Sequence, residues 1–200
     1  MSKIAILTNG CSFHNRFFEM EEYKGLYDDV IHILNVPTTN LLKYDTVIVT
    51  ERISIPHLKL NQGKFLQFLN EGKRLFIFGE VLDNWMPTVA WQDSVVNFSW
   101  WVKPQGDLPL VERNNLHDLY EYVTLKDMKW HYHGTFMPPK GAFSLVDNDE
   151  GRSIFYIDNV SFKGELVVTS LDPIFHIGLG FINQTEPFLN GLTKWLRGSK

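Results

Sequence analysis

The chain is poor in cysteine and has no long hydrophobic run. Cys11 is the only cysteine among the 200 residues, which excludes an internal disulfide framework. No stretch approaches the ~18 consecutive apolar residues of a transmembrane helix. The apolar stretch near the N-terminus is only about five residues long, shorter than the core of a signal peptide. We therefore expect a cytoplasmic protein that does not insert into a membrane.

An excess of charge of one sign is also missing. Lys and Arg number 19 and Asp and Glu number 23, which gives a net charge of -4. A chain with this balance has no general attraction for nucleic acid or for anionic membranes. Neither a GxxxxGK[ST] nor a GxGxxG phosphate loop occurs. We expect a small-molecule ligand, no nucleic-acid partner and no cofactor, and the sequence leaves open a homo-oligomer.

What is present favours one globular α/β domain over residues 1–200. Hydrophobic residues make up 44% of the chain and aromatic residues 14%, enough for a sizeable core at this length. The first 80 residues alternate short apolar runs with amphipathic ones. We predict strands over 3–8, 30–34, 44–49 and 74–78, and helices over 17–27 and 55–71. This alternation is typical of a doubly wound, mostly parallel sheet with helices on both faces, a three-layer arrangement.

The region 81–129 interrupts this alternation and contains Trp85, Trp91, Trp100 and Trp101. We interpret it as an inserted, aromatic-rich segment, with only a weak strand signal over 95–102. Because it leaves the sheet at the carboxyl end of a strand, it is placed to cover a ligand site. After it we predict strands over 130–133, 142–146, 153–160 and 165–170, and a closing helix over 186–196.

Four stretches together resemble the class I glutamine amidotransferase-like superfamily, which has a flavodoxin-like fold. They are residues 41–49 (LLKYDTVIV), 68–80 (FLNEGKRLFIFGE), 164–176 (GELVVTSLDPIFH) and 188–196 (FLNGLTKWL). In style the chain is closer to trehalose-utilisation-like members that are not amidotransferases. The resemblance covers most of the chain outside residues 81–129, and it implies an amidotransferase-like α/β fold.

The resemblance also implies where catalytic residues belong. Catalytic members carry a Cys nucleophile on the turn after the strand that matches 75–78, and a His after the late strand, usually followed two residues later by Glu. Here the turn reads Gly79-Glu80-Val81, without Cys, Ser or Thr. His176 occupies the histidine position, but Gly178 stands two residues later. The resemblance thus argues against glutamine hydrolysis through a thioester.

Candidate site residues follow from the rule that ligands of parallel sheets bind beyond the carboxyl ends of the strands. We expect Glu80, Asp172 and His176 to be catalytic if the protein is an enzyme. Glu80 suits a general acid or base, and His176 suits proton transfer near neutral pH. Each has a structural alternative: Glu80 and Asp172 as caps of a helix or turn, and His176 as a buried core histidine.

Further ligand-binding candidates lie at the other strand ends and in the aromatic segment. They are Asn9, Gly10, Cys11, Glu51, His131, His133 and Trp101. A strand at 130–133 would put His131 and His133 on one face, where a third group such as Asp172 or His176 would complete a metal site. That spacing is weak, and we predict a metal-free site. Cys11 is the only thiol, and a lone Cys is more often a small buried hydrophobe than a nucleophile.

Three function classes remain open from the sequence. The first is a small-molecule-binding domain that has lost the Cys nucleophile and is not a glutaminase. The second is a hydrolase or related enzyme that uses Glu80, Asp172 and His176 on a small polar or sugar-like compound. The third is a protein-interaction subunit whose aromatic segment contacts another protein.

Overall fold

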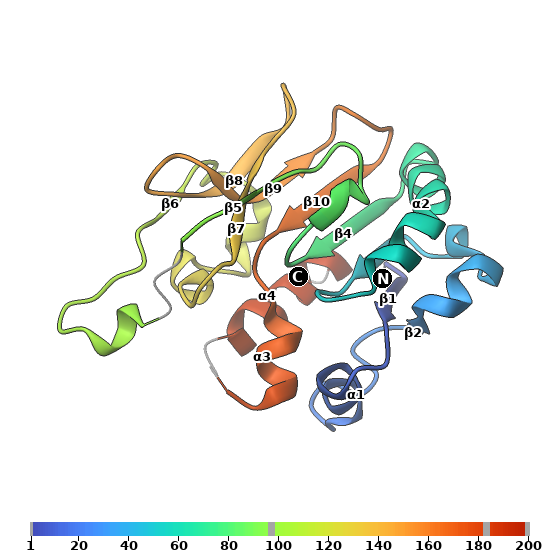
Figure 1. Cartoon of the computed structure of the whole chain (residues 1–200), viewed down its shortest axis with the longest axis horizontal. Helices are drawn as coiled ribbons and strands as arrows, with labels where there is room; N and C mark the ends of the chain where they lie inside the picture. Colours follow the sequence, from blue (N-terminus) through green and yellow to red (C-terminus); the bar gives the residue numbers. More distant parts are fainter. Residues whose placement is uncertain (1, 96–98, 182–184, 199–200) are drawn as a thin grey trace.

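The parallel part of the sheet contains the strands at both ends of the chain. The computed structural model describes residues 2–95, 99–181 and 185–198. Five strands pair in parallel in the order β2-β1-β3-β4-β10 (Figure 1). Their bounds are β1 Ile4–Thr8, β2 Asp29–His32, β3 Thr46–Val49, β4 Arg74–Phe78 and β10 Glu165–Thr169. This order is that of flavodoxin-like folds.

Beyond β10 the sheet continues with antiparallel strands. β9 (Ser153–Asp158) pairs with β10, β8 and β7, while β5 pairs with β7 and β6 with β8. The other bounds are β5 Ala90–Asp93, β6 Leu110–Glu112, β7 Gly134–Met137 and β8 Phe143–Asn148. The aromatic segment 81–129 therefore supplies β5 and β6 to the margin of this antiparallel half.

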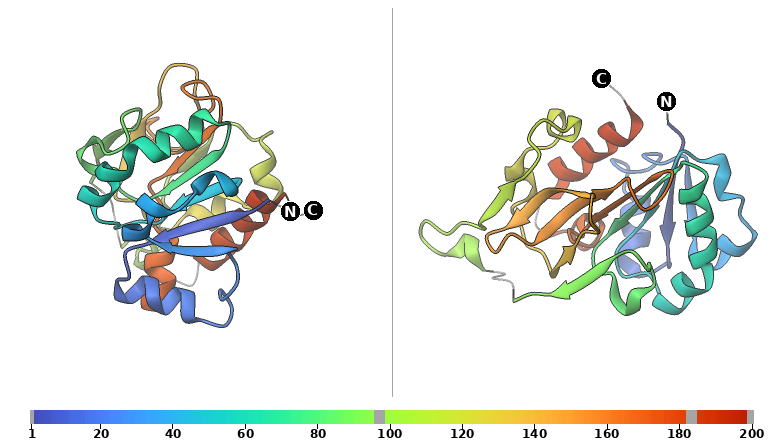
Figure 2. Two further views of the ribbon diagram at one scale, coloured as in Figure 1. Left: turned by 90° about the vertical axis from the view of Figure 1, so that its right-hand side faces the viewer. Right: turned by 90° about the horizontal axis from the view of Figure 1, so that it is seen from above.

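Helices cover both faces of the sheet (Figure 2). Helices α1 (Ser12–Glu19), α3 (Pro173–Leu179) and α4 (Thr185–Arg197) share one buried apolar cluster with the sheet, and α2 (Ile55–Asn70) packs into the other. Short 3₁₀ helices span Ile33–Thr38, Leu41–Lys43, Leu82–Asn84, Trp100–Val102, Asp118–Glu121 and Leu125–Met128. No helix of the described residues is long and apolar enough to span a membrane. The expected α/β fold, a central sheet flanked by helices, is confirmed.

Three predicted elements are wrong. The helix expected over 17–27 begins instead at Ser12 and ends at Glu19, because Met20 takes an extended conformation. The apolar residues beyond it are buried without being helical; Tyr23 stacks on Phe17 with ring centroids 4.6 Å apart. Of the weak strand at 95–102, residues 96–98 lie outside the described part, and Trp100–Val102 form a 3₁₀ helix. The strand expected at 130–133 is absent, since β7 begins only at Gly134.

Candidate functional site

Helix α3 was missed by the sequence analysis and places two site residues. Asp172 occupies the N-cap position, Pro173 is the first helical residue, and Gly180 ends the helix with φ of 78°. A Pro at the first position and a left-handed Gly after the last are the usual signals of a helix. These signals were present in the sequence, but seven residues are too few for a clear apolar period. His176 lies one turn after Asp172.

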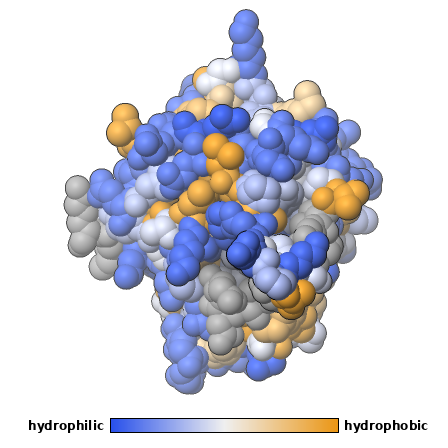
Figure 3. All heavy atoms as spheres, turned by 90° about the vertical axis from the view of Figure 1, so that its left-hand side faces the viewer, coloured by the Kyte–Doolittle hydropathy of each residue, from blue (hydrophilic) through white to orange (hydrophobic). Residues whose placement is uncertain are grey.

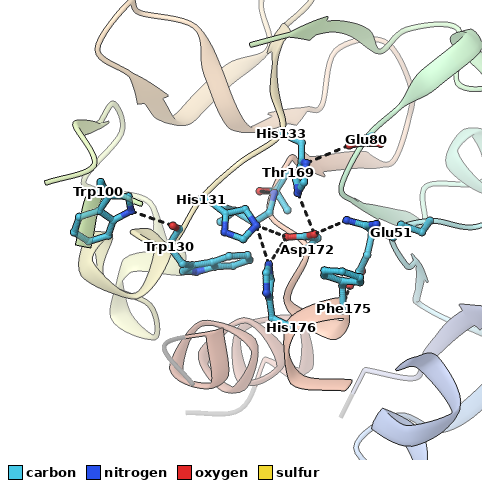
Figure 4. Close-up of polar contacts among 12 residues, drawn as sticks. Glu51, Glu80, Trp100, Trp130, His131, His133, Thr169, Asp172, Phe175 and His176 are labelled. Carbon is cyan, nitrogen blue, oxygen red and sulfur yellow. Dashed lines mark hydrogen bonds and ion pairs between the residues drawn. The ribbon is translucent and has the colours of Figure 1, made fainter. Parts of the chain in front are cut away.

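Asp172 does not cap α3 with its own side chain. Instead, the backbone N–H of Phe175 donates to Glu51 Oε1, which reaches the helix from the end of β3 (Figure 4). Gly79 at the end of β4 makes room for this, because a Cβ there would lie 2.7 Å from Glu51 Cβ. Glu51 therefore satisfies the helix start and leaves the Asp172 carboxylate free for other partners.

The Asp172 carboxylate lies beside two buried imidazoles (Figure 4). His176 Nε2 is 3.2 Å from Asp172 Oδ1, and His131 Nε2 is 3.8 Å from the same oxygen. The two Nε2 atoms are 2.9 Å apart. The side chains of Asp172, His131 and His176 are 2%, 6% and 1% exposed. Three atoms with lone pairs thus meet at one buried point.

The second oxygen of Asp172 faces more exposed groups. His133 Nε2 lies 3.5 Å and an Arg52 guanidinium nitrogen 3.7 Å from Oδ2. His133 Nδ1 lies 3.4 Å from Glu80 Oε1, and the Glu80 side chain is 40% exposed. Glu80, His133, Asp172 and His176 therefore form a connected series from the surface to the interior. We call these residues, with His131, the histidine–aspartate cluster.

Burial and charge shift the pKa values of these groups in opposite directions. Burial alone raises the pKa of Asp172, but its contacts with His133 and His176 outweigh burial and hold the pKa at about 2. The hydrogen bond to Asp172 raises the pKa of His133. Burial lowers the pKa of His131 to about 4. Burial, with the charge of Asp172, raises the pKa of Glu51 to about 8.

Aromatic rings fix the buried imidazoles. The His176 ring contacts Phe181 and Trp130 edge-on, with centroids 4.7 and 5.4 Å away. Trp100 Nε1 donates to the Trp130 carbonyl oxygen over 3.1 Å (Figure 4). The aromatic segment thus reaches the cluster through Trp130. The side chain of Trp101, expected to bind ligand, lies outside the described part of the structure.

A cavity of about 210 Å³ lies next to the exposed end of the cluster. Arg52 and Glu80 line it, with apolar side chains from the ends of β3 and β4 and with Trp85. Trp85 is 1% exposed and packs against Phe65 of α2. Of the tryptophans expected over the site, Trp85 forms part of the wall of this cavity.

Arg52, which the sequence analysis did not select, has φ of 60°. This left-handed conformation is uncommon for a residue other than Gly, and such strain gathers at functional sites. Asn9 Nδ2 donates to the Arg52 carbonyl oxygen over 2.8 Å and holds the turn. Asn9 therefore positions Arg52.

The other residues expected after β1 point to local contacts. The Gly10 N–H donates to Thr8 Oγ1 and the Cys11 N–H to Asn9 Oδ1. Cys11 is the N-cap residue of α1, and burial raises the pKa of its thiol. Among the described residues, the hydrogen bonds and ion pairs found for Gly10 and Cys11 do not include the histidine–aspartate cluster.

No protein-family model matches the chain, and no curated protein matches it. Solved structures do. A cytoplasmic protein from Salmonella typhimurium LT2 matches with a TM-score of 0.62 at 12% identity, over 97% of this chain and 99% of that one. A candidate GMP synthase component from Thermoplasma acidophilum matches with 0.59 at 9%, over 99% and 95%. A glutamine amidotransferase from Thermotoga maritima matches with 0.55 at 9%, over 98% and 84%. At these identities the likeness shows the fold alone, and that fold is amidotransferase-like.

Proposed function

We propose that this protein is a small-molecule-binding domain of amidotransferase-like fold, with its ligand site at the histidine–aspartate cluster, and that it is not a glutaminase. The burial of Asp172 with three histidines around it carries the proposal. Withdrawing ionised groups from water costs several kcal/mol each unless they are well paired. Strongly shifted titratable groups gather at functional sites. A cluster of this kind at the carboxyl edge of the sheet supports ligand binding.

The absence of a suitable nucleophile supports the second half of the proposal. Gly79, Glu80 and Val81 follow β4, and none of them has a thiol or hydroxyl. Cys11 has a raised thiol pKa, whereas a nucleophilic Cys needs a lowered one. The carboxylate that contacts His176 comes from Asp172, four residues before it, and not from a residue two positions after it.

Enzymatic action on a small polar or sugar-like compound is the second candidate. The observation that favours it is the connected series Glu80, His133, Asp172 and His176, with steps of 3.2 to 3.5 Å. Such a series can carry a proton between an exposed carboxylate and a buried imidazole. It makes Glu80 the group that meets the substrate and His176 the residue at the inner end.

A protein-interaction role, the third class, has less support. Such a role favours a broad apolar surface. The face drawn in Figure 3 is mainly hydrophilic, with apolar residues in separate groups.

The ligand site is tested by thermal unfolding of the full chain with millimolar L-glutamine, trehalose, D-glucose and D-mannose as probes. We expect at least one polyhydroxy probe to raise the Tm of the wild type, because a ligand that binds only the folded state stabilises it. The shift should shrink in Glu80→Gln and Arg52→Gln and persist in the matched control Glu112→Gln. Equal shifts in all variants, or none in the wild type, would contradict this ligand site. Product formation from a binding probe would select the enzyme.

A further inference from the structure

The buried end of the cluster has too many lone pairs for its protons. His131 Nε2, His176 Nε2 and Asp172 Oδ1 lie 2.9, 3.2 and 3.8 Å from one another. One proton placed between two of these atoms leaves the third without a donor. A cation placed among them attracts all three lone pairs at once.

The spacing also suits a metal ion. Zinc binds imidazole nitrogen and carboxylate oxygen at about 2.0–2.2 Å, so two ligands of a tetrahedral site are about 3.3 Å apart. The three measured separations lie on both sides of this value. The three atoms all fall within 4.8 Å of one another.

We propose that His131, Asp172 and His176 bind a divalent transition-metal ion of the zinc class through Nε2, Oδ1 and Nε2. Two imidazoles and one carboxylate suit Zn²⁺ and its first-row neighbours, whereas Mg²⁺ and Ca²⁺ prefer oxygen ligands. Three protein ligands leave a position for water or for a ligand atom, as in catalytic zinc sites.

The surroundings hold these ligands in place. Asp172 Oδ2 faces His133 and Arg52, which fixes the plane of the carboxylate. The His176 ring packs against Trp130 and Phe181. Outer contacts of this type orient metal ligands and raise metal affinity.

This site differs from the one considered on sequence grounds. There, His131 and His133 would act together from one strand face. In the structure residues 131–133 are not a strand, and His133 faces Asp172 Oδ2 and Glu80 instead. The inference deepens the proposed function and rests on it for the role of the ion toward the small molecule.

The test measures metal binding by the full chain without a purification tag. The protein is stripped with EDTA, dialysed against micromolar Zn²⁺ with excess Mg²⁺, and its zinc measured by atomic emission. We expect one Zn²⁺ per chain in the wild type and in His57→Ala, a matched control in α2. His131→Ala and His176→Ala should weaken binding by about 100-fold or more.

Folding of each variant is checked by circular dichroism, because both histidines are buried. If an alanine variant does not fold, His131→Gln and Asp172→Asn replace it, and the Co²⁺ absorption spectrum reports the ligand geometry. A wild type that takes up no stoichiometric Zn²⁺, or folded variants that bind it unchanged, would overturn the metal site. The probe panel, repeated on EDTA-stripped protein, separates this failure from failure of the proposed function.

Discussion

At the scale of single residues, Glu51 determines how Asp172 is used. An N-cap Asp ordinarily accepts hydrogen bonds from the first turn of its own helix. Glu51 takes that role for α3 from a different strand, and the Asp172 carboxylate turns to the histidines. One substitution of Glu51 therefore probes both the helix start and the access of Asp172 to the cluster.

Glu51→Ala should destabilise the protein more than Glu51→Gln. Alanine leaves the buried Phe175 N–H without an acceptor, whereas the glutamine Oε1 retains one. An unsatisfied buried donor costs about 1–3 kcal/mol, so the two variants should differ by about that amount in urea unfolding at pH 7. Equal free energies of unfolding would show that the Glu51 cap contributes nothing.

His14 should make the protein sensitive to acid. Its side chain is fully buried, with Nδ1 3.2 Å from Thr8 Oγ1, and burial lowers its pKa to about 4. Unfolded chains bind this proton near pH 6.5, so the unfolded state gains protons first as the pH falls. The free energy of unfolding should therefore decrease between pH 6.5 and 4, by up to about 3 kcal/mol.

Urea unfolding across this pH range checks the contribution of His14. His14→Leu should lose this part of the acid sensitivity, and the control His57→Ala should keep it. An unchanged acid slope in His14→Leu would contradict the buried neutral state of His14.

At the scale of elements, the close approach of α1 to α3 positions the cluster from below. Gly178 of α3 lies against the backbone of Phe13, so that an added Cβ would clash with the Phe13 carbonyl oxygen. Because α3 carries Asp172 and His176, its position on α1 also sets their distance from His131. A second helical glycine, Gly63 of α2, has nothing within 4 Å of such a Cβ.

Gly178→Ala should destabilise the fold by about 1–3 kcal/mol, because overpacking a tight contact forces the backbone to move. Gly63→Ala, the matched control, should stabilise it by about 0.5–1 kcal/mol, since alanine is the better helix former. Thermal and urea unfolding of both variants measures this contrast. Similar effects of the two substitutions would rule out the tight α1–α3 contact.

The sequence predicts the parallel half of the sheet well and the antiparallel half poorly. The strand at 74–78 is found at the predicted residues, and α2 ends one residue before the predicted end. Those elements have continuous apolar runs or a full helical period. β5 and β6 have four and three residues, several of them exposed, so they carry no clear period. Their place depends on pairing with distant strands, which no local pattern encodes.

The candidate site shows the same division at the scale of the whole molecule. Strand ends in the parallel half place Glu51, Glu80 and Asp172 as the sequence indicates, because parallel strands end at one edge. His131 and His133 come from the antiparallel half, and their meeting with Asp172 depends on how the two halves join at β10 and β9. The reason given from the sequence, a shared strand face, is wrong, although both histidines do contact the cluster.

The central claim is an amidotransferase-like fold that works without thiol chemistry, and ammonia release from L-glutamine tests it most directly. The assay compares the purified full chain with its Cys11→Ala variant and with a known glutaminase as positive control. Since the turn after β4 offers no nucleophile, we predict no release above the protein-free blank for either chain. Release by the wild type that disappears in Cys11→Ala would contradict the account and make Cys11 the nucleophile.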